Sequence, residues 1–295
     1  MKSLKLKSPA KLNLFLQVLN LRPDGYHNLH TLFHRISLCD SLILKKSNNK
    51  DFQLITKHPE LQDVSDNIIF RAHKLLRKNF KWKGGVKVIL KKNVPLGGGL
   101  GGGSSNAAHF LLGMNQLFKL GISRPKMMKL GAKLGSDVPF FICGANQAIG
   151  VGRGDRIKIC KIKKKLWFVL VCPHFGVPTK EAYTMLARQR KGKSLRKLTR
   201  IRCVGRITHS LFKYLRQKKI PKFLQNDLFK ASCLIRPELR RICSFFEVIG
   251  IKPLMSGSGS TIFSIHLSKR EASCVAKKIT RQKPEANVFI CHTYE

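Results

Sequence analysis

The feature that most constrains this chain is a glycine-rich segment at residues 97–103, which reads Gly-Gly-Gly-Leu-Gly-Gly-Gly. Glycine loses more backbone freedom on folding than any other residue, so a folded chain keeps such a run where its backbone must approach a ligand closely. Residues 86–90 before the segment alternate like a strand, and residues from about Ser104 to Phe118 after it have helical character. A glycine loop that leads into a helix presents unpaired N–H groups and a positive dipole end to an anion. The segment therefore predicts a phosphate-binding loop.

Two other phosphate-binding patterns fit this loop poorly. The P-loop pattern requires a lysine directly after the glycines, and none follows here. Gly97, Gly99 and Gly102 do match G-x-G-x-x-G, but a dinucleotide-binding fold also uses an acidic residue about 20 positions later. No Asp or Glu occurs between Asp66 and Asp137. Both a P-loop NTPase and a dehydrogenase are therefore disfavoured.

The remaining sequence predicts strands interleaved with helices. We predict strands over 12–20, 31–43, 86–90, 166–171, 248–251, 261–266 and 287–291. We predict helices from Asp66, the expected N-cap, to about 76, and over 104–118, 125–135, 179–188, 227–234, 237–246 and 269–279. The order lacks a strict βαβ rhythm, which indicates an α+β fold with two lobes, residues 1–150 and residues 151–295.

The charge of the chain is extreme, at +42 from 57 Lys+Arg against 15 Asp+Glu. Such a balance is typical of proteins that bind nucleic acid. The basic residues, however, recur in short runs such as 163–165 and 188–197 rather than in one tail or helix face. We therefore favour a lysine-rich surface over a nucleic-acid site.

The location of the protein follows from its cysteines and its apolar runs. None of the nine cysteines forms a C-x-x-C pair, which favours reduced thiols over a disulfide framework or a zinc site. No apolar run reaches the ~18 residues that a membrane-spanning helix needs, and Pro9 interrupts any signal-peptide core near the N-terminus. We expect a cytoplasmic monomer or weak homodimer without a membrane partner.

The glycine loop resembles the central motif of the GHMP kinases, P-x-x-x-G-L-G-[SG]-[SG]-[SA]. Pro95, residues 99–101 and the Ser104-Ser105 pair match it. Residues 9–16 resemble the N-terminal motif of the family, and residues 255–261 resemble its C-terminal glycine motif. The three motifs occur in the expected order, so the resemblance covers nearly the full chain. It implies the two-lobed GHMP fold, in which an N-terminal lobe like domain 2 of ribosomal protein S5 and an α/β C-terminal lobe enclose the active site.

Within the family, residues 22–29 and 135–141 resemble the branch that acts in the non-mevalonate isoprenoid route. The resemblance implies ATP-dependent phosphorylation of the 2-hydroxyl of a methylerythritol linked to cytidine diphosphate, with Mg²⁺ as the accompanying metal. Another GHMP kinase, such as a mevalonate or homoserine kinase, would share the loop but would have no use for the Tyr26-His27 pair. A nucleic-acid-binding protein on a related fold would show salt-dependent binding without ATP turnover.

Two residues are candidates for the chemical step. Asp137 stands in a long stretch without other acids and precedes the apolar run 138–141. Alone, it could equally be a turn or cap residue, but the resemblance implies a general base. Lys11 lies in an apolar strand, and the resemblance makes it the second catalytic residue, which would orient Asp137 and balance charge on the phosphoryl oxygens. Asn13 lies two positions on, hence on the same strand face, and we expect it near the substrate hydroxyls.

The binding residues follow from the same resemblance. We expect Asn67 near the adenine and the loop around the ATP phosphates, namely Pro95, Leu96, Gly97, Gly98, Gly99, Leu100, Gly101, Gly102, Gly103, Ser104 and Ser105. The two serines could also cap the helix, and Ser105 is a candidate Mg²⁺ ligand. We expect Tyr26, His27 and Tyr183 around the cytidine, and Gly257, Ser258 and Gly259 at the substrate diphosphate.

Overall fold

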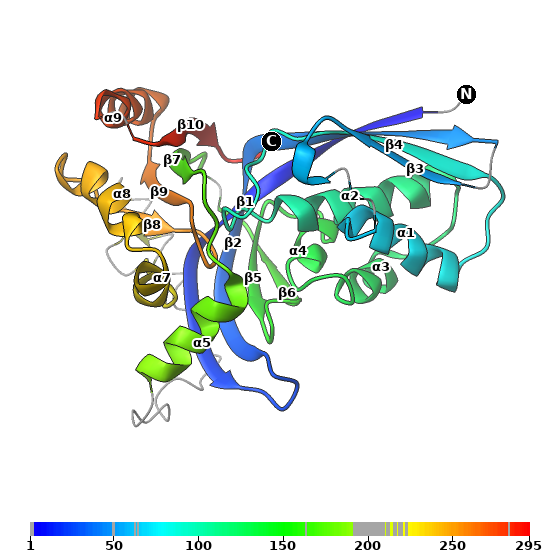
Figure 1. Ribbon diagram of the computed structural model, residues 1–295, viewed down its shortest axis with the longest axis horizontal. Coiled ribbons are helices and arrows are strands. Elements are labelled where there is room, and N and C mark those ends of the chain that lie inside the picture. Colours follow the sequence, from blue (N-terminus) through cyan, green and yellow to red (C-terminus); the bar gives the residue numbers. More distant parts are fainter. Residues whose placement is uncertain are drawn as a thin grey trace.

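The computed structural model describes residues 3–48, 51–61, 63, 65–162, 164–190, 210, 213–214, 217, 221, 224–282 and 284–295. Within these ranges the chain forms two β-sheets, each with helices against it (Figure 1). The predicted α+β class is therefore confirmed. Most of the basic run 188–197, and most of residues 188–218, lie outside the described residues.

The first sheet has the strand order β3-β4-β2-β5-β6, and β1 pairs with β2. Its strands are β1 (Ser3–Leu21), β2 (His27–Ser47), β3 (Phe52–Thr56), β4 (Gly85–Lys91), β5 (Gln147–Val151) and β6 (Arg156–Cys160). Only β3 and β4 are parallel to each other. The helices of this part are η1 (Pro59–Leu61), α1 (Ile68–Asn79), α2 (Gly102–Leu117), α3 (Arg124–Gly131) and α4 (Val138–Ile142). Because β6 belongs to this sheet, the sheet continues past residue 150, and the lobe boundary there stays a prediction.

The second sheet has the order β10-β7-β9-β8 and is antiparallel throughout. Its strands are β7 (Trp167–Pro173), β8 (Leu254–Met255), β9 (Ile262–His266) and β10 (Ala286–His292). The helices of this part are α5 (Thr179–Gln189), α7 (Phe229–Ile235), α8 (Glu238–Glu247) and α9 (Lys269–Arg281). Their apolar faces bury Ala182, Leu239, Phe246 and Ile279 in one cluster with Val169 of the sheet.

β1 and β2 link the two sheets. They are the long blue strands of Figure 1, and their hairpin reaches the neighbourhood of α5. A buried apolar cluster joins Leu12 and Leu14 of β1 and Leu32 of β2 to Phe168 and Phe263 of the second sheet. Burying a side chain of this size stabilises the fold by roughly 1.5–3 kcal/mol. The two sheets are therefore held together by apolar packing along β1 and β2.

Three predicted local features are wrong in detail. The N-cap of α1 is Asn67, whose side chain accepts a hydrogen bond from the backbone N–H of Ile69 at 2.9 Å, and not Asp66. The helix predicted over 125–135 ends at Gly131. α2 begins at Gly102 with Gly101 as its N-cap, so Ser104 and Ser105 lie inside the first turn and do not cap it.

Residues 248–251, predicted as a strand, form the turn that closes α8. The N–H of Ile251 donates to Phe246 O at 2.9 Å, and the N–H of Gly250 donates to Glu247 O at 2.9 Å. Gly250 has a φ of 74°. These bonds form a Schellman motif, in which a left-handed glycine closes the helix. The β-branched residues around Gly250 match a strand pattern. The backbone N–H groups of Gly250 and Ile251 instead donate to the carbonyls at the end of α8.

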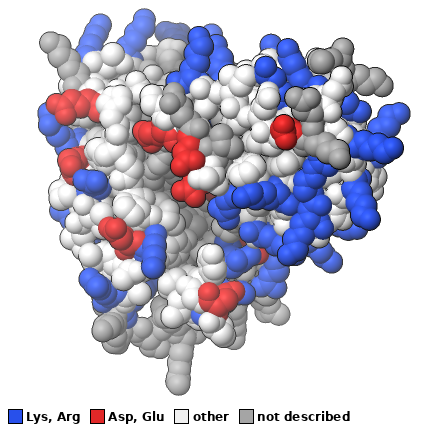
Figure 2. Space-filling model, turned by 45° about the vertical axis from the view of Figure 1, so that its right-hand side comes forward, with Lys and Arg blue, Asp and Glu red and all other residues white. Residues whose placement is uncertain are grey.

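The charged residues are spread over the surface. Figure 2 shows Lys and Arg side chains over much of one face, broadest on its right-hand side, with smaller groups of Asp and Glu between them. Among the described residues, no helix combines the length and the apolar character that crossing a membrane requires.

Candidate active site

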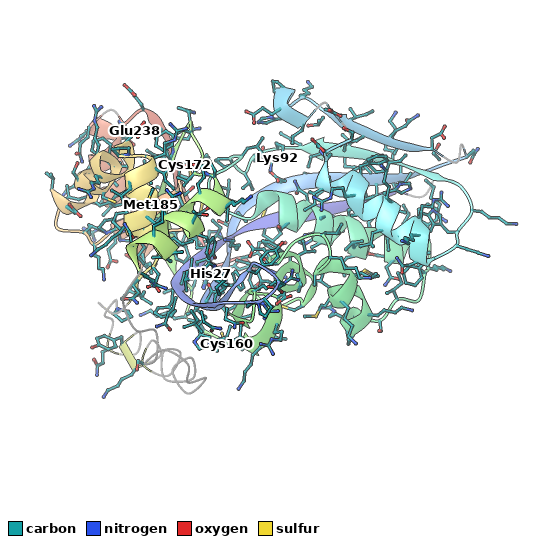
Figure 3. All side chains as sticks on the ribbon, turned by 60° about the horizontal axis from the view of Figure 1, so that its bottom comes forward. His27, Lys92, Cys160, Cys172, Met185 and Glu238 are labelled. Carbon is teal, nitrogen blue, oxygen red and sulfur yellow. The ribbon has the colours of Figure 1, made fainter. Side chains whose placement is uncertain are left out.

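A cavity of about 1300 Å³ lies where the β1–β2 hairpin, the glycine loop, the segment before α4 and α5 meet. His27 at the start of β2 and Lys92 just before the glycine loop both line it (Figure 3). Nearly all of the predicted site residues line this one cavity. Two of them, Ser105 and Gly259, do not.

The glycine loop is fixed on both sides by backbone contacts. Lys11 N donates to Leu100 O at 2.9 Å, so β1 anchors the middle of the loop. Thr261 N donates to Gly98 O at 3.2 Å, and the Ser256 hydroxyl donates to Gly99 O at 2.9 Å. The glycine loop and the C-terminal glycine motif, far apart in the sequence, are therefore bound directly to each other.

This close approach explains why the loop needs glycine. A Cβ at Gly99 would lie 2.1 Å from the carbonyl oxygen of Ser256, which is less than any real contact distance. Gly97, Gly99 and Gly101 also have positive φ values of 67°, 72° and 68°, which L side chains rarely adopt. The close approach of two backbones therefore requires glycine at position 99, and the left-handed conformation favours glycine at positions 97 and 101 as well.

The two serines after the loop have different surroundings. Ser104 lines the cavity in the first turn of α2, where N–H groups without intrahelical partners favour an anion. Ser105 is fully buried, and its hydroxyl accepts a hydrogen bond from Ser8 at 2.8 Å. The geometry therefore puts Ser104, and not Ser105, within reach of a cavity ligand.

Lys11 and Asp137 meet in the cavity. Lys11 Nζ lies 3.5 Å from Asp137 Oδ2, and it donates to Asn13 Oδ1 at 2.6 Å and to Gly99 O at 2.8 Å. The Lys11 side chain is 3% exposed, whereas that of Asp137 is 29% exposed. Register shifts in the β1–β2 ladder on both sides of Lys11 change the local twist of β1, as β-bulges do. The ammonium group is therefore fixed by three oxygens, and one carboxylate edge remains open to the cavity.

Asp137 owes its position to the chain that follows it. It immediately precedes α4, whose residues 138–142 are all buried, with Pro139 in the first turn. The same helix is held by Arg35, whose guanidinium donates to Phe140 O at 3.0 Å and to Phe141 O. The apolar run therefore anchors the short helix that places the carboxylate.

An aromatic group also lines the cavity. The rings of His27 and Tyr183 are stacked with their centres 5.3 Å apart. Burial lowers the pKa of His27, and the positive charge of Arg190 lowers it further, so the ring is neutral near pH 7. Burial raises the pKa of Tyr183, and the charge of Asp137 adds to this effect. Tyr26 is 53% exposed beside them. All three aromatic side chains line the cavity, and aromatic rings can stack on a planar heterocycle.

The C-terminal glycine motif is held at the cavity by polar side chains. Asn226 Nδ2 donates to Gly257 O at 2.7 Å, and the Ser232 hydroxyl donates to Ser258 O at 2.9 Å. Thr179 Oγ1 lies 3.0 Å from the Ser258 hydroxyl. Gly257 and Ser258 line the cavity, so this part of the motif is accessible to a ligand.

Sequence reasoning missed a buried ion pair at the edge of the site. Lys92 Nζ donates to Asp40 Oδ2, and Asp40 Oδ1 accepts from the N–H groups of Asn93 and Val94 at 2.8 Å each. Burial lowers the pKa of Lys92, and the Asp40 charge offsets part of that effect. Asp40 thereby fixes the entry to the glycine loop. An isolated acid in an apolar strand was the only signal in the sequence.

Asn67 both caps α1 and lines the cavity. A cap of this kind contributes roughly 1 kcal/mol of stability. Its side-chain oxygen is engaged by Ile69 N, so its remaining amide group is the part that could face a ligand.

The Gly101→Val substitution should weaken ATP binding. Gly101 has a φ of 68°, and a Cβ there would lie 3.0 Å from Lys11 Cε. In the complex with ATP, valine at position 101 would have to adopt the left-handed conformation, which costs a branched residue of order 1–2 kcal/mol. We therefore expect the ATP Kd in a calorimetric titration to rise by about 5- to 30-fold. Gly121→Val is the matched control, because Gly121 has a φ of 65° but open space around it. An unchanged ATP Kd for Gly101→Val would remove the loop from the nucleotide site.

Residues 67–145 match the family described as the GHMP kinases N terminal domain. A relative named 4-diphosphocytidyl-2-C-methyl-D-erythritol kinase, from Syntrophus aciditrophicus (strain SB), is 40% identical over 272 residues, which cover 91% of this chain and 92% of the relative. A protein of the same name from Citrifermentans bemidjiense is 35% identical over 284 residues and 96% of both chains.

Solved structures of GHMP kinases also match this chain over nearly its full length. A crystal structure of 4-(cytidine 5'-diphospho)-2C-methyl-D-erythritol kinase superposes with a TM-score of 0.80 at 28% identity, covering 99% of this chain and 100% of the other. The mevalonate kinase of Methanococcus jannaschii, at 15% identity and a TM-score of 0.66, shares the fold over 100% of this chain and 99% of its own. The chain therefore belongs to the GHMP kinases, and within them to the 4-diphosphocytidyl-2-C-methyl-D-erythritol kinase family.

Proposed function

We propose that this protein transfers the γ-phosphate of ATP to the 2-hydroxyl of 4-diphosphocytidyl-2-C-methyl-D-erythritol, a step of non-mevalonate isoprenoid biosynthesis. The observation that carries the proposal is the Lys11–Asp137 pair beside the glycine loop, in the same cavity as the His27–Tyr183 stack. The names of the relatives, which cover nearly all of the chain, support this substrate.

The chemistry needs positioning, charge neutralisation and a proton acceptor. Asp137 would take the proton of the 2-hydroxyl as the hydroxyl oxygen attacks the γ-phosphorus and the bond to the β-phosphate oxygen breaks, which releases ADP. Lys11, held by Asn13 and Gly99, would keep the Asp137 carboxylate in place and balance negative charge on the phosphoryl oxygens. Asn13 in turn donates to Thr31 at 2.7 Å, which fixes the orientation of its amide.

The binding roles divide along the cavity. The N–H groups of the glycine loop and of the start of α2 would hold the ATP phosphates, with Asn67 near the adenine. Tyr26, His27 and Tyr183 would hold the cytosine. The backbone of Gly257 and Ser258 would contact the substrate diphosphate. Gly259, which has a φ of 90°, would allow the chain turn that places these two residues there.

The residues present fit a Mg²⁺ ion that is bound mainly through the nucleotide. Among the described residues, no cluster of three or more His, Cys, Asp or Glu side chains could hold a metal by itself. Mg²⁺ usually keeps several waters and binds one or two protein oxygens plus substrate phosphates. Ser104 lines the cavity and could supply such an oxygen, and the ion would neutralise phosphate charge. Ser105 fits this role less well, because it is buried against Ser8.

We also propose a cytoplasmic location. The eight cysteines among the described residues are free thiols, which is the usual state in the cytosol.

A coupled assay of ADP release tests the proposed function. We expect ATP turnover to depend on 4-diphosphocytidyl-2-C-methyl-D-erythritol and to be at background level with mevalonate or homoserine. Substrate-independent turnover, or equal rates with the three alcohols, would refute the assignment. Steeply salt-dependent nucleic-acid binding without turnover would favour the rival function.

A further inference from the structure

Two hairpins meet beside the exposed ring of Tyr26. One is the β1–β2 hairpin that carries Tyr26, and the other is the turn between β5 and β6 that carries Arg153. The guanidinium carbon of Arg153 lies 4.8 Å from the centre of the Tyr26 ring, within the range of a cation–π contact. Both side chains line the cavity. One face of the proposed base-stacking ring is therefore already covered by a cation of the chain itself.

The Arg153 side chain is held in place from two directions. Its Nε and Nη2 donate to Asp155 Oδ2 at 3.2 and 2.9 Å. Nη2 also donates to the carbonyl of Ala132, just after α3, at 3.3 Å. Because the side chain is only 25% exposed and is bound at its tip, its guanidinium plane is fixed before any ligand arrives.

The loop under Tyr26 is also fixed. Arg22 Nη2 donates to Asp24 Oδ2 at 2.9 Å, and Asp24 Oδ1 accepts from the N–H of Tyr26 at 3.2 Å. Leu29 N donates to Gly152 O at 2.7 Å, which ties the strand after the loop directly to the β5–β6 turn. The backbone of Tyr26 is therefore set by hydrogen bonds, while its ring, at 53% exposure, depends on side-chain contacts for its orientation.

We propose that Arg153 is a positioning residue for pyrimidine recognition: it occupies one face of the Tyr26 ring and so orients the opposite face toward the cytosine. The inference rests on the proposed function, since it presumes a cytidine-linked substrate. An exposed tyrosine that is already oriented loses less conformational freedom when the substrate binds, so the substrate affinity is higher. Arg153 then acts through Tyr26, without a contact of its own to the base.

The first test compares steady-state constants. Arg153→Ala should raise the KM for 4-diphosphocytidyl-2-C-methyl-D-erythritol by about 2- to 5-fold, the range of a cation–π contact at a partly exposed site. The kcat and the KM for ATP should stay unchanged, because the Lys11–Asp137 pair is not touched. Arg153→Lys keeps a cation and should recover most of the affinity. Arg156→Ala is the matched control, since Arg156 is exposed on β6 and does not line the cavity.

A double-mutant cycle with Tyr26→Ala separates positioning from direct binding. Losing base stacking alone should weaken the substrate by ~1–3 kcal/mol. If Arg153 acts through Tyr26, Arg153→Ala should have no further effect in the Tyr26→Ala background. Equal KM increases in both backgrounds would overturn the positioning role, as would an unchanged KM for Arg153→Ala alone.

The proposed function is tested separately by calorimetric titration of the unmodified protein with cytidine 5'-diphosphate. If that protein neither binds this probe nor phosphorylates the substrate, the proposed function is wrong, and the inference falls with it. If it does both and Arg153→Ala behaves like the unmodified protein, only the inference is overturned.

Discussion

Asp137→Asn is expected to bind ATP and the cytidine-linked substrate normally and to turn over about 10²–10⁴-fold more slowly than the unmodified protein. Asparagine keeps the shape of the side chain and its hydrogen bonding, but its amide cannot accept the proton of the attacking hydroxyl. Asp137 precedes α4, whose residues are buried, so the substitution should leave the local backbone unchanged. Single-turnover phosphoryl transfer at saturating ATP and substrate measures the chemical step directly.

The matched control for this substitution is Asp63→Asn. The Asp63 carboxylate is exposed, bonds Ser65, and does not line the cavity. The control should react at the rate of the unmodified protein. A kcat for Asp137→Asn within a few-fold of the unmodified value would exclude the general-base role.

Lys11→Met is expected to lower kcat by a comparable factor. Methionine retains the apolar stem but removes the charge. The side-chain oxygen of Asn13 loses its lysine donor, and the carbonyl of Gly99 loses that donor but keeps the hydrogen bond from the Ser256 hydroxyl. The Asp137 carboxylate also loses the cation that lies 3.5 Å away. The same single-turnover assay applies. Lys7→Met is the control, because Lys7 is exposed on the same strand.

The double mutant of Lys11 and Asp137 shows whether the two groups work as a unit. Residues that act together in one step give losses far smaller than the product of the single effects. We therefore expect the double mutant to be only slightly slower than either single mutant. Fully multiplicative losses would mean that the lysine acts on the phosphate independently of the carboxylate.

Local sequence signals were sufficient for most elements and for the glycine loop. The glycine run, the strand before it and the helix after it depend on neighbouring residues only, so they could be predicted without the fold. The same holds for α9, whose N-cap Ser268 accepts from Glu271 N. The strand prediction at 248–251 was wrong, because a glycine flanked by β-branched residues is compatible both with a strand and with the Schellman motif that closes α8.

The candidate residues were identified largely through motif resemblance, and their own sequence context was ambiguous. Asp137 reads equally well as a turn or cap residue, and it does precede a helix. Asp40 and Lys92 carried no local signal of their pairing, because a buried ion pair is defined by two strands that meet in space. Ser104 and Ser105 are adjacent in sequence, and the helical turn directs one to the cavity and the other to Ser8.

The sequence by itself determined the glycine loop, the α+β class with most of its helices and strands, and the set of polar residues from which a site could be built, because these depend largely on short-range backbone preferences. It did not reveal the strands β3, β5, β6 and β8 or the short helix α4. The tertiary structure alone decided that Lys11 and Asp137 lie 3.5 Å apart, that the two glycine motifs interlock, and that Arg153 covers the Tyr26 ring. These contacts join distant parts of the chain. The glycine motifs meet because apolar packing along β1 and β2 brings the two sheets together, and the other two contacts form within the first sheet and the segments around it. A linear pattern contains no measure of these distances.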